Sequence, residues 1–236
     1  MNLVIIYKEE FSGDGIAVIC DPRRVLHIQG VLKALPGNQI KVGLLNGRIG
    51  EGNILTSTPE KIELQVELSS EPPPALPVTL IFSLPRPKTY KKILQAATAM
   101  GVKKFIVIES WKVDKSYWNS PVLSEEETRE QFILGLEQGG DTVLPEISVK
   151  RRFKPFVEDE LSGIIKGRLP LLAHPRAVCD CPRNIAGPLV LCIGPEGGFT
   201  EYEIALLEKS GMQPVSIGDR ILRTEFAVCA ILGRLG

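Results

Sequence analysis

Apolar and polar residues along the first seventy positions fall into short runs that predict β-strands. The runs occupy residues 3–7, 15–20, 39–45 and 61–68, and the last of them alternates with a period of two. Asn46-Gly47 lies between the third run and RIGEGNIL, residues 48–55, and predicts a two-residue hairpin turn, because both residues tolerate positive φ. HIQGVLKALPG, residues 27–37, predicts a short helix that ends at Pro36-Gly37. Together these segments predict a small β-barrel.

The pattern changes after residue 71. EPPPALP, residues 71–77, contains four prolines and predicts a stiff, extended connector. Beyond it strands alternate with helices. The strands are predicted at 78–84, 105–108, 143–147, 169–173, 189–193 and 214–218, and the helices at 87–100, 124–140, 155–167, 201–210 and the C-terminal end. Continuous apolar strands separated by helices are typical of a parallel sheet covered on both faces. We therefore predict two domains, a β-barrel over 1–71 and an α/β domain over 72–236.

Composition limits the class of protein. The chain has 236 residues, of which 44% are hydrophobic and 24% charged, so it is globular rather than disordered. No apolar run approaches the roughly 20 residues of a membrane-spanning helix, which favours a soluble, cytoplasmic protein without a membrane partner. The five cysteines are scattered and odd in number, unlike the disulfide framework of a small secreted protein. A reducing compartment fits this pattern.

The zero formal charge argues against a protein that holds nucleic acid by bulk electrostatics, but charge is segregated locally. Residues 86–115 carry eight lysines and arginines against Glu109 and Asp114, and residues 150–154 form a second basic group. Tyr90, Trp111, Tyr117 and Trp118 lie in or beside the first stretch. Basic patches with aromatic faces are typical of enzymes that bind RNA. For 86–104 taken alone, a solvated helix face is an equally good interpretation.

The sharpest candidate for a ligand site is IGPEGGFTEYE at 193–203. It follows an apolar strand and leads into a helix for which Thr200 and Glu203 predict a capping box. Ligands of open α/β sheets bind at the carboxyl ends of strands, where this loop would lie. A tight turn that needs glycine for positive φ is an alternative of about equal weight. The segment has neither the G-x-G-x-x-G spacing of dinucleotide-binding proteins nor the G-K-[ST] of a P-loop.

Two further loops follow predicted strands. In IGDRILRTEFA, residues 217–227, Thr224 is a candidate N-cap, and Arg223 could reach an anionic or carbonyl-rich ligand. A surface Arg–Glu pair is the alternative there. LLAHPRA, residues 171–177, places His174 after another strand. His174 with Cys179 and Cys181 could suggest zinc, but a fourth ligand is missing and the spacing matches no common finger, so we expect no metal.

The combination of these segments resembles the bacterial 16S ribosomal RNA uridine N3 methyltransferases, a family of the SPOUT class. The specific pair is IGPEGGFTEYEI followed by SIGDRILRTEFA, with LLAHPRA upstream. Further segments that resemble the family are HIQGVLKALPGN, ILQAATAMGVKKFIVI and LEQGGDTVLPEI. The resemblance therefore covers nearly the whole chain.

The resemblance implies a fold, a cofactor and an assembly. The fold is a PUA-like β-barrel that helps to hold RNA, followed by a SPOUT-type α/β domain with a trefoil knot. The cofactor is S-adenosyl-L-methionine, and the enzyme is a homodimer that acts on 16S ribosomal RNA in the small ribosomal subunit. The cofactor-binding residues it implies are Leu172, Ala173, His174, Ile193, Gly194, Pro195, Gly197, Gly198, Ile217, Gly218, Ile221, Leu222 and Thr224.

The chemistry of the uridine assigns candidate roles to two residues. N3 must lose its proton before it attacks the methyl group, and the resulting anion spreads over O2 and O4. A fixed guanidinium stabilises such an anion, and Arg223 is our candidate. Glu196 could orient the uridine or accept its proton, or its hydrogen bonds could hold the loop. We expect RNA contacts from His27, Lys33, Arg86, Lys88, Lys91, Lys92, Arg151 and Arg152.

Four positions depart from the pattern common in the family. They are Gly30, Ala99, Asp141 and Phe226. These departures keep two alternatives open. One is a SPOUT methyltransferase with a different RNA target, and the other is a ribosome-binding homologue without catalysis.

Overall fold

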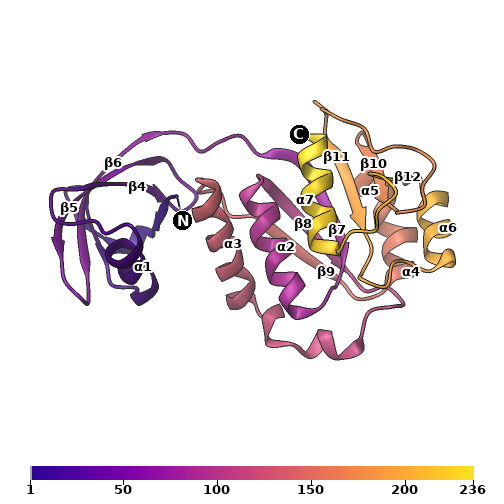
Figure 1. The fold of residues 1–236 in the computed structure, drawn as a ribbon, viewed down its shortest axis with the longest axis horizontal. Helices are drawn as coiled ribbons and strands as arrows, with labels where there is room; N and C mark the ends of the chain where they lie inside the picture. Colours follow the sequence, from indigo (N-terminus) through magenta and orange to yellow (C-terminus); the bar gives the residue numbers. More distant parts are fainter. Residues whose placement is uncertain (1) are drawn as a thin grey trace. The chain divides into compact units, whose positions relative to one another are not determined.

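The computed structural model describes residues 2–236, which form two compact units. The first unit extends to Pro74 and also includes Ile133–Leu144. The second comprises Ala75–Phe132 and Pro145–Gly236. Each unit has a six-stranded sheet of its own (Figure 1).

The first unit is built on a curled mixed sheet with strand order β1-β4-β5-β6-β3-β2. β1 pairs with β4 in parallel, and the other neighbours are antiparallel. The strands are β1 (Val4–Ile6), β2 (Phe11–Gly13), β3 (Ile16–Ile19), β4 (Gln39–Leu44), β5 (Ile49–Ser57) and β6 (Ile62–Ser70). A 3₁₀ turn, Lys8–Glu10, follows β1. The four predicted strands are confirmed, and β5 follows the predicted hairpin turn. β2 was missed because its residues, Phe11-Ser12-Gly13, form no apolar run.

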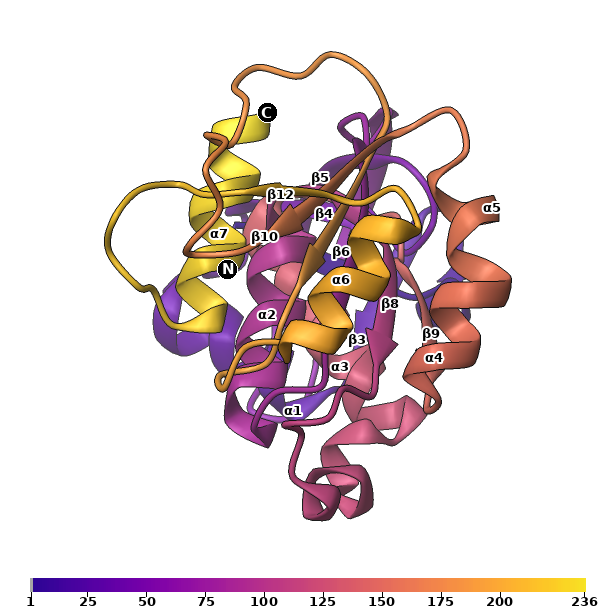
Figure 2. The same cartoon turned by 90° about the vertical axis from the view of Figure 1, so that its right-hand side faces the viewer.

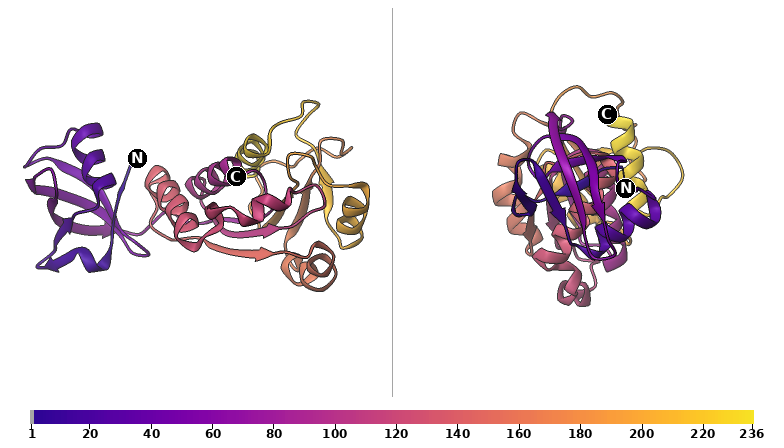
Figure 3. Two further views of the ribbon diagram at one scale, coloured as in Figure 1. Left: turned by 90° about the horizontal axis from the view of Figure 1, so that it is seen from below. Right: turned by 90° about the vertical axis from the view of Figure 1, so that its left-hand side faces the viewer.

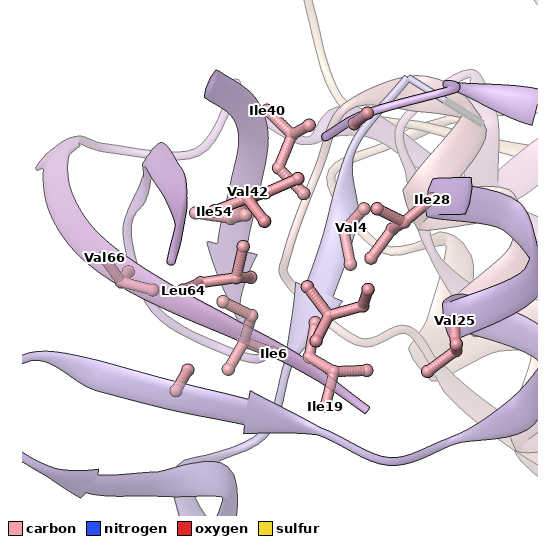
Figure 4. Packing of buried hydrophobic residues seen from close by; sticks show 13 residues of the cluster. Val4, Ile6, Ile19, Val25, Ile28, Ile40, Val42, Ile54, Leu64 and Val66 are labelled. Carbon is pink, nitrogen blue, oxygen red and sulfur yellow. The ribbon is translucent and has the colours of Figure 1, made fainter. Parts of the chain in front are cut away.

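Alternation along these strands produces the core of the first unit. Ile62, Leu64 and Val66 point inward from β6, as the period of two predicted. They pack with apolar residues of β1, β3, β4 and β5 and of the helix after β3 (Figure 4). The predicted hairpin at Asn46-Gly47 joins β4 to β5, and Asn46 has a φ of +58°.

The helix predicted over 27–37 was misplaced. It begins earlier, as α1 (Pro22–Leu26), and continues as a π-helical turn, His27–Val31. The Asp21 side chain accepts a hydrogen bond from the Arg24 backbone N–H at 2.9 Å, and Pro22 occupies the first helical position. The Asp-Pro start was therefore visible in the sequence, and the helix ends before Pro36 rather than at it.

A segment from the middle of the chain completes the first unit. Ile133 and Leu136, from the end of α3 (Glu125–Gly139), pack against Leu3 and Ile5. The backbone carbonyl of Glu137 accepts hydrogen bonds from Asn2 and Leu3, and its buried carboxylate pairs with Arg23 at 2.7 Å. Residues 133–144 thus share a core with the N-terminal strands.

The second unit has a six-stranded sheet in which every neighbouring pair is parallel. Its order is β12-β10-β11-β7-β8-β9. The strands are β7 (Leu76–Ser83), β8 (Val102–Ile108), β9 (Glu146–Lys150), β10 (Leu169–Ala173), β11 (Leu189–Ile193) and β12 (Gln213–Val215). The predicted parallel α/β architecture is therefore confirmed. β7 starts inside the predicted connector, and Pro77 lies where the β7–β8 register shifts, a position at which proline is tolerated.

Helices cover both faces of this sheet, as Figure 2 shows. α2 (Pro87–Ala99), the start of α3 and α7 (Thr224–Leu235) lie on one face, where Tyr90 packs against Phe82 and Phe132 against Phe105. Figures 1 and 3 show α7, in yellow, alongside α2. The other face carries the helical stretch from Phe153 to Ile165 and α6 (Glu201–Lys209). That stretch comprises α4 (Phe153–Pro155), a π-helical turn at Phe156–Glu160 and α5 (Leu161–Ile165).

The long connection between β10 and β11 contacts the end of the chain at two places. Cys181 donates a backbone hydrogen bond to Ser216 at 2.7 Å, just after β12. Ile185 donates one to Leu235, at the end of α7, also at 2.7 Å. The predicted strand 214–218 therefore stops at Val215, and Ser216 pairs with this connection instead.

Two short 3₁₀ turns, Lys115–Asn119 and Pro121–Leu123, link β8 to α3. Across residues 2–236, no helix has the length and apolar character needed to cross a membrane.

Candidate functional site

Three loops leave the sheet of the second unit at the same level. Ala173, the last residue of β10, pairs with Ile193 at the end of β11 and with Val215 at the end of β12. Because the strands are parallel, the chain after each of them emerges at one edge. This register brings the three predicted loops, at 172–174, 193–198 and 217–224, to the carboxyl ends of adjacent strands. In Figure 2 the yellow loop after β12 descends to the start of α7.

The turn after β11 is fixed by local hydrogen bonds. Gly198 has a φ of +67°, which glycine adopts without strain, and its N–H donates to the Pro195 carbonyl at 2.8 Å. The predicted capping box is confirmed: the Thr200 hydroxyl accepts from the Glu203 N–H, and the Glu203 carboxylate accepts from the Thr200 N–H at 2.8 Å. The functional and the structural interpretations of this turn are thus compatible.

Glu196 connects this turn to the start of α2. Its Oε1 accepts a hydrogen bond from the backbone N–H of Arg86 at 3.0 Å. Arg86 follows β7 and is the N-cap residue of α2. A carboxylate at this position accepts a hydrogen bond from an N–H that has no partner within the helix. Its negative charge is stabilised by the positive end of the helix dipole. Glu196 is otherwise exposed, so one carboxylate oxygen remains accessible from the loop edge.

Lys112 belongs to the same site, although the sequence analysis counted it only as one of the cations of residues 86–115. Its Nζ donates to the Gly197 carbonyl at 2.9 Å, and a Cβ placed on Gly197 would lie 3.2 Å from the Lys112 side chain. The Trp111 N–H donates to Glu203 Oε1 at 2.7 Å. Both residues follow β8, whose carboxyl end lies at this edge, so their place in the sequence was the available signal.

The loop after β12 ends at Arg223. Gly218 has a φ of +133°, and a Cβ built there would meet nothing within 4 Å. Arg223 is the N-cap of α7 and is exposed, and within residues 2–236 its side chain has no hydrogen-bond or ion-pair partner. Thr224 was predicted as the N-cap, but it is the first helical residue and is buried. The cap is thus one residue earlier and makes no side-chain hydrogen bond.

Apolar side chains flank the polar groups of these loops. Leu172, Ile193 and Pro195 are buried beneath them. Ile221 is 83% exposed and Leu222 is also exposed. An edge with backbone donors and acceptors, glycines and apolar side chains suits a ligand with an apolar ring and a polar chain.

His174, Cys179 and Cys181 form the group weighed in the sequence as a zinc site. The His174 Nδ1 accepts a hydrogen bond from the Arg176 N–H at 3.3 Å. Within residues 2–236, no three side chains of His, Cys, Asp or Glu lie together in a way that could hold a metal ion. Burial raises the pKa of the thiols of Cys181, Cys192 and Cys229, so these stay protonated at neutral pH.

The predicted RNA-binding residues of the second unit have different surroundings. Lys91 pairs with Glu127 at 2.5 Å, and Lys92 pairs with the buried Glu225 at 3.4 Å. These two cations therefore also serve the packing of α2. Four further predicted residues are exposed: Arg86, Lys88, Arg151 and Arg152.

The first unit carries the other two predicted RNA contacts. His27 begins the π-helical turn and is partly exposed, and Lys33 is exposed with a φ of +52°. Both lie close in sequence to a group of exposed apolar residues, Leu26, Val31, Leu32 and Leu35.

Comparison with known sequences gives the family context. A family model described as an RNA methyltransferase domain matches residues 71–236. A protein of Treponema pallidum named ribosomal RNA small subunit methyltransferase E is 29% identical, over 98% of this chain and 88% of that protein. A protein of Borreliella burgdorferi named ribosomal RNA small subunit methyltransferase E 1 is 28% identical, over 98% of this chain and 95% of its own length.

Solved structures show the same fold. A ribosomal RNA small subunit methyltransferase E from Neisseria gonorrhoeae, bound to S-adenosyl methionine, aligns with a TM-score of 0.72 at 22% identity. The alignment covers 98% of this chain and 95% of that one. A putative methyltransferase from Legionella pneumophila, also in complex with that cofactor, aligns with a TM-score of 0.70 at 22% identity, over 98% and 96% of the two chains. The predicted α/β fold, a parallel sheet preceded by a small β-barrel-like domain, is confirmed.

Proposed function

Since this chain belongs to the RNA methyltransferase family, we propose that it methylates N3 of a uridine in 16S ribosomal RNA, within the small ribosomal subunit. The methyl donor in this proposal is S-adenosyl-L-methionine, and the cytoplasm is the place of action. The observation that carries the proposal is the register of β12, β10 and β11, which brings three loops to one edge. The names of the relatives and the cofactor in the two structural neighbours support it.

The loop residues fit this donor. An adenine ring requires apolar walls and backbone hydrogen-bond partners, and Ile217, Ile221 and Leu222 lie in the same loop as Gly218. The space at Gly218, where a Cβ would meet nothing, lets a ligand approach the backbone closely. When bound, the donor supplies a methyl group on a positively charged sulfur and leaves as a neutral sulfide. The cofactor-binding residues expected from the sequence are retained in the proposal.

Arg223 has the properties required to stabilise the uridine anion. Its backbone is fixed as the N-cap of α7, while its guanidinium is exposed and not engaged by the described residues. Loss of the N3 proton spreads negative charge over O2 and O4. A planar guanidinium can donate hydrogen bonds to these oxygens in a fixed geometry. Such hydrogen bonds lower the barrier most when the guanidinium is already in place before the charge develops.

Glu196 is assigned a positioning role. Its Oε1 is already engaged by the Arg86 N–H, so the carboxylate holds the turn after β11 against the start of α2. A general base, in contrast, needs a negatively charged carboxylate that can accept the N3 proton. We therefore expect Glu196→Gln, whose amide oxygen can accept the same N–H, to keep kcat within about threefold, and Glu196→Ala to lower kcat about 10-fold to 100-fold.

Single-turnover methyl transfer with both variants measures the difference. A general base contributes about 10²- to 10⁴-fold. If Glu196→Gln loses activity to the same extent as Glu196→Ala, the carboxylate acts as a base and the positioning role is wrong.

The proposed enzyme is a homodimer. Its support is the set of exposed apolar residues around the start of α7, namely Ile221, Leu222 and Phe226. Exposed apolar patches of this kind mark interaction sites. We expect sedimentation equilibrium to give twice the chain mass for the wild type and a weakened dimer for the Phe226→Asp variant. A wild-type protein that sediments as a monomer at micromolar concentration would exclude this part of the proposal.

The experiment that tests the function uses small ribosomal subunits from cells that lack the modification. Calorimetry first measures S-adenosyl-L-methionine binding to the purified chain. Methyl transfer is then followed by mass spectrometry of nucleosides and of RNA fragments. N3-methyluridine in 16S ribosomal RNA supports the proposal. A different methylated nucleotide identifies another RNA target, and a chain that binds the subunit but not the donor is a non-catalytic homologue.

A further inference from the structure

Trp111 is an unusual surface residue. Its side chain is 84% exposed, whereas the chain's other tryptophan, Trp118, is 9% exposed and packs beneath the Arg151 guanidinium at 4.9 Å. Tryptophan is the largest side chain and is usually well buried, so near-complete exposure of an indole indicates a contact with something outside the described fold.

The backbone that carries this indole is fixed to the proposed active-site loop. The Trp111 N–H donates to Glu203 Oε1 at 2.7 Å, and Glu203 is itself buried in the capping box of α6. The next residue, Lys112, donates to the Gly197 carbonyl at 2.9 Å. The exposed ring is thus held on a constrained segment beside the Gly-Pro-Glu-Gly-Gly turn, and little backbone entropy would be lost when a ligand binds to it.

The surroundings of the indole are basic. The sheet order β11-β7-β8-β9 places the loops after β7 and β9 on either side of the loop after β8. Those two loops carry exposed arginines, Arg86 after β7 and Arg151 and Arg152 after β9. Lys112 adds a further exposed cation. Glu109 lies 3.9 Å from Arg151 and offsets part of this charge.

An aromatic face among cations matches the chemistry of single-stranded RNA. Phosphates are neutralised by Lys and Arg, and unstacked bases stack on aromatic rings. We infer that Trp111 is a stacking platform for an unpaired base of the substrate RNA next to the methylated nucleotide, a role that rests on the proposed function of the same site. The arginines of the flanking loops then hold the phosphates on either side of that base.

Fluorescence measures the stacking directly, because the two tryptophans can be separated. The probe is a short single-stranded oligouridylate, titrated into the full chain in the absence of methyl donor. Stacking is expected to quench emission in the wild type and in Trp118→Phe, whose remaining indole is Trp111. In Trp111→Phe the buried indole should give no quenching.

Kinetics on undermethylated small subunits give a second readout. We expect Trp111→Ala to raise KM for the subunit about tenfold or more, with kcat within about twofold and donor affinity unchanged. Trp111→Phe keeps an aromatic ring and should recover most of the loss. Unchanged KM in Trp111→Ala, or quenching that persists in Trp111→Phe, would overturn the inference. A Trp111→Ala protein that differs from the wild type only in its oligomeric state would also overturn the inference, because Trp111 would then contact another protein chain.

The outcomes separate this inference from the proposed function. If the wild type shows Trp111 quenching by RNA but makes no N3-methyluridine, the proposed function is wrong, and Trp111 still stacks on RNA but not beside a methylated uridine. If N3-methyluridine forms with the same KM in Trp111→Ala and wild type, only the stacking role is wrong.

Discussion

Replacement of Arg223 by alanine should reduce methyl transfer to small ribosomal subunits by at least about 10²-fold, because one donor that stabilises a developing oxyanion contributes about that much to kcat. The guanidinium has no partner among residues 2–236, so its removal leaves no buried group unsatisfied. The backbone of Arg223 still caps α7 in the variant. We therefore expect the affinity for S-adenosyl-L-methionine to stay within several-fold of the wild type. Single-turnover transfer and calorimetry measure the two quantities separately.

Arg223→Lys is the matched control. It keeps the positive charge but replaces a planar fork by a mobile ammonium, so we expect an intermediate rate. Arg220→Ala removes another exposed arginine of the same loop and should change the rate little. Wild-type turnover in Arg223→Ala would remove this residue from the chemistry, and equal losses in Arg220→Ala would indicate a general effect of charge.

The sequence predicted the strands at this site well because their periodicity and length are local properties. The strand predicted at 189–193 matches β11 to the residue, and the predicted helices at 87–100 and 201–210 match α2 and α6 to within one residue. The capping box of Thr200 and Glu203 is a four-residue pattern that needs no tertiary information. Loops that follow such elements are therefore placed correctly along the chain.

What the sequence could not supply is the order of the strands in the sheet. β12, β10 and β11 are neighbours, and β7 lies between β11 and β8. This order brings Glu196 to the Arg86 N–H and Lys112 to Gly197, across 110 and 85 positions of the chain. No local pattern encodes such pairings. For the same reason the sequence alone left open whether Glu196 acts as a base or as a positioning residue.

The basic stretch at 86–115 shows a second limit. The sequence presents its lysines as equivalent, but Lys91 and Lys92 form ion pairs with Glu127 and Glu225. Lys112 binds backbone carbonyls of the turn after β11. Composition identifies a charged surface, and only tertiary partners separate the cations that support packing from those that remain for a ligand.

The second large effect is expected on stability, in the first unit. The Arg24 side chain is 4% exposed and donates to both carboxylate oxygens of Glu10, at 2.9 and 2.6 Å, and to the Ile5 carbonyl at 2.8 Å. Arg24→Ala leaves the Glu10 carboxylate, itself only 13% exposed, without this partner. Breaking a buried pair in this way costs about 3 to 5 kcal/mol. We expect the free energy of unfolding of the first unit to fall by that amount.

Arg48→Ala is the matched control, because its pair with Glu71 is largely exposed, at 61% and 72% of the two side chains. Exposed pairs contribute about 0 to 1 kcal/mol, so this variant should be nearly as stable as the wild type. Both tryptophans lie in the second unit, so fluorescence would report on the wrong part of the chain. Hydrogen exchange of β4, β5 and β6, followed by mass spectrometry in urea, reports on the first unit directly. Equal protection of these strands in the two variants would show that burial of the Arg24–Glu10 pair does not set the stability of the barrel.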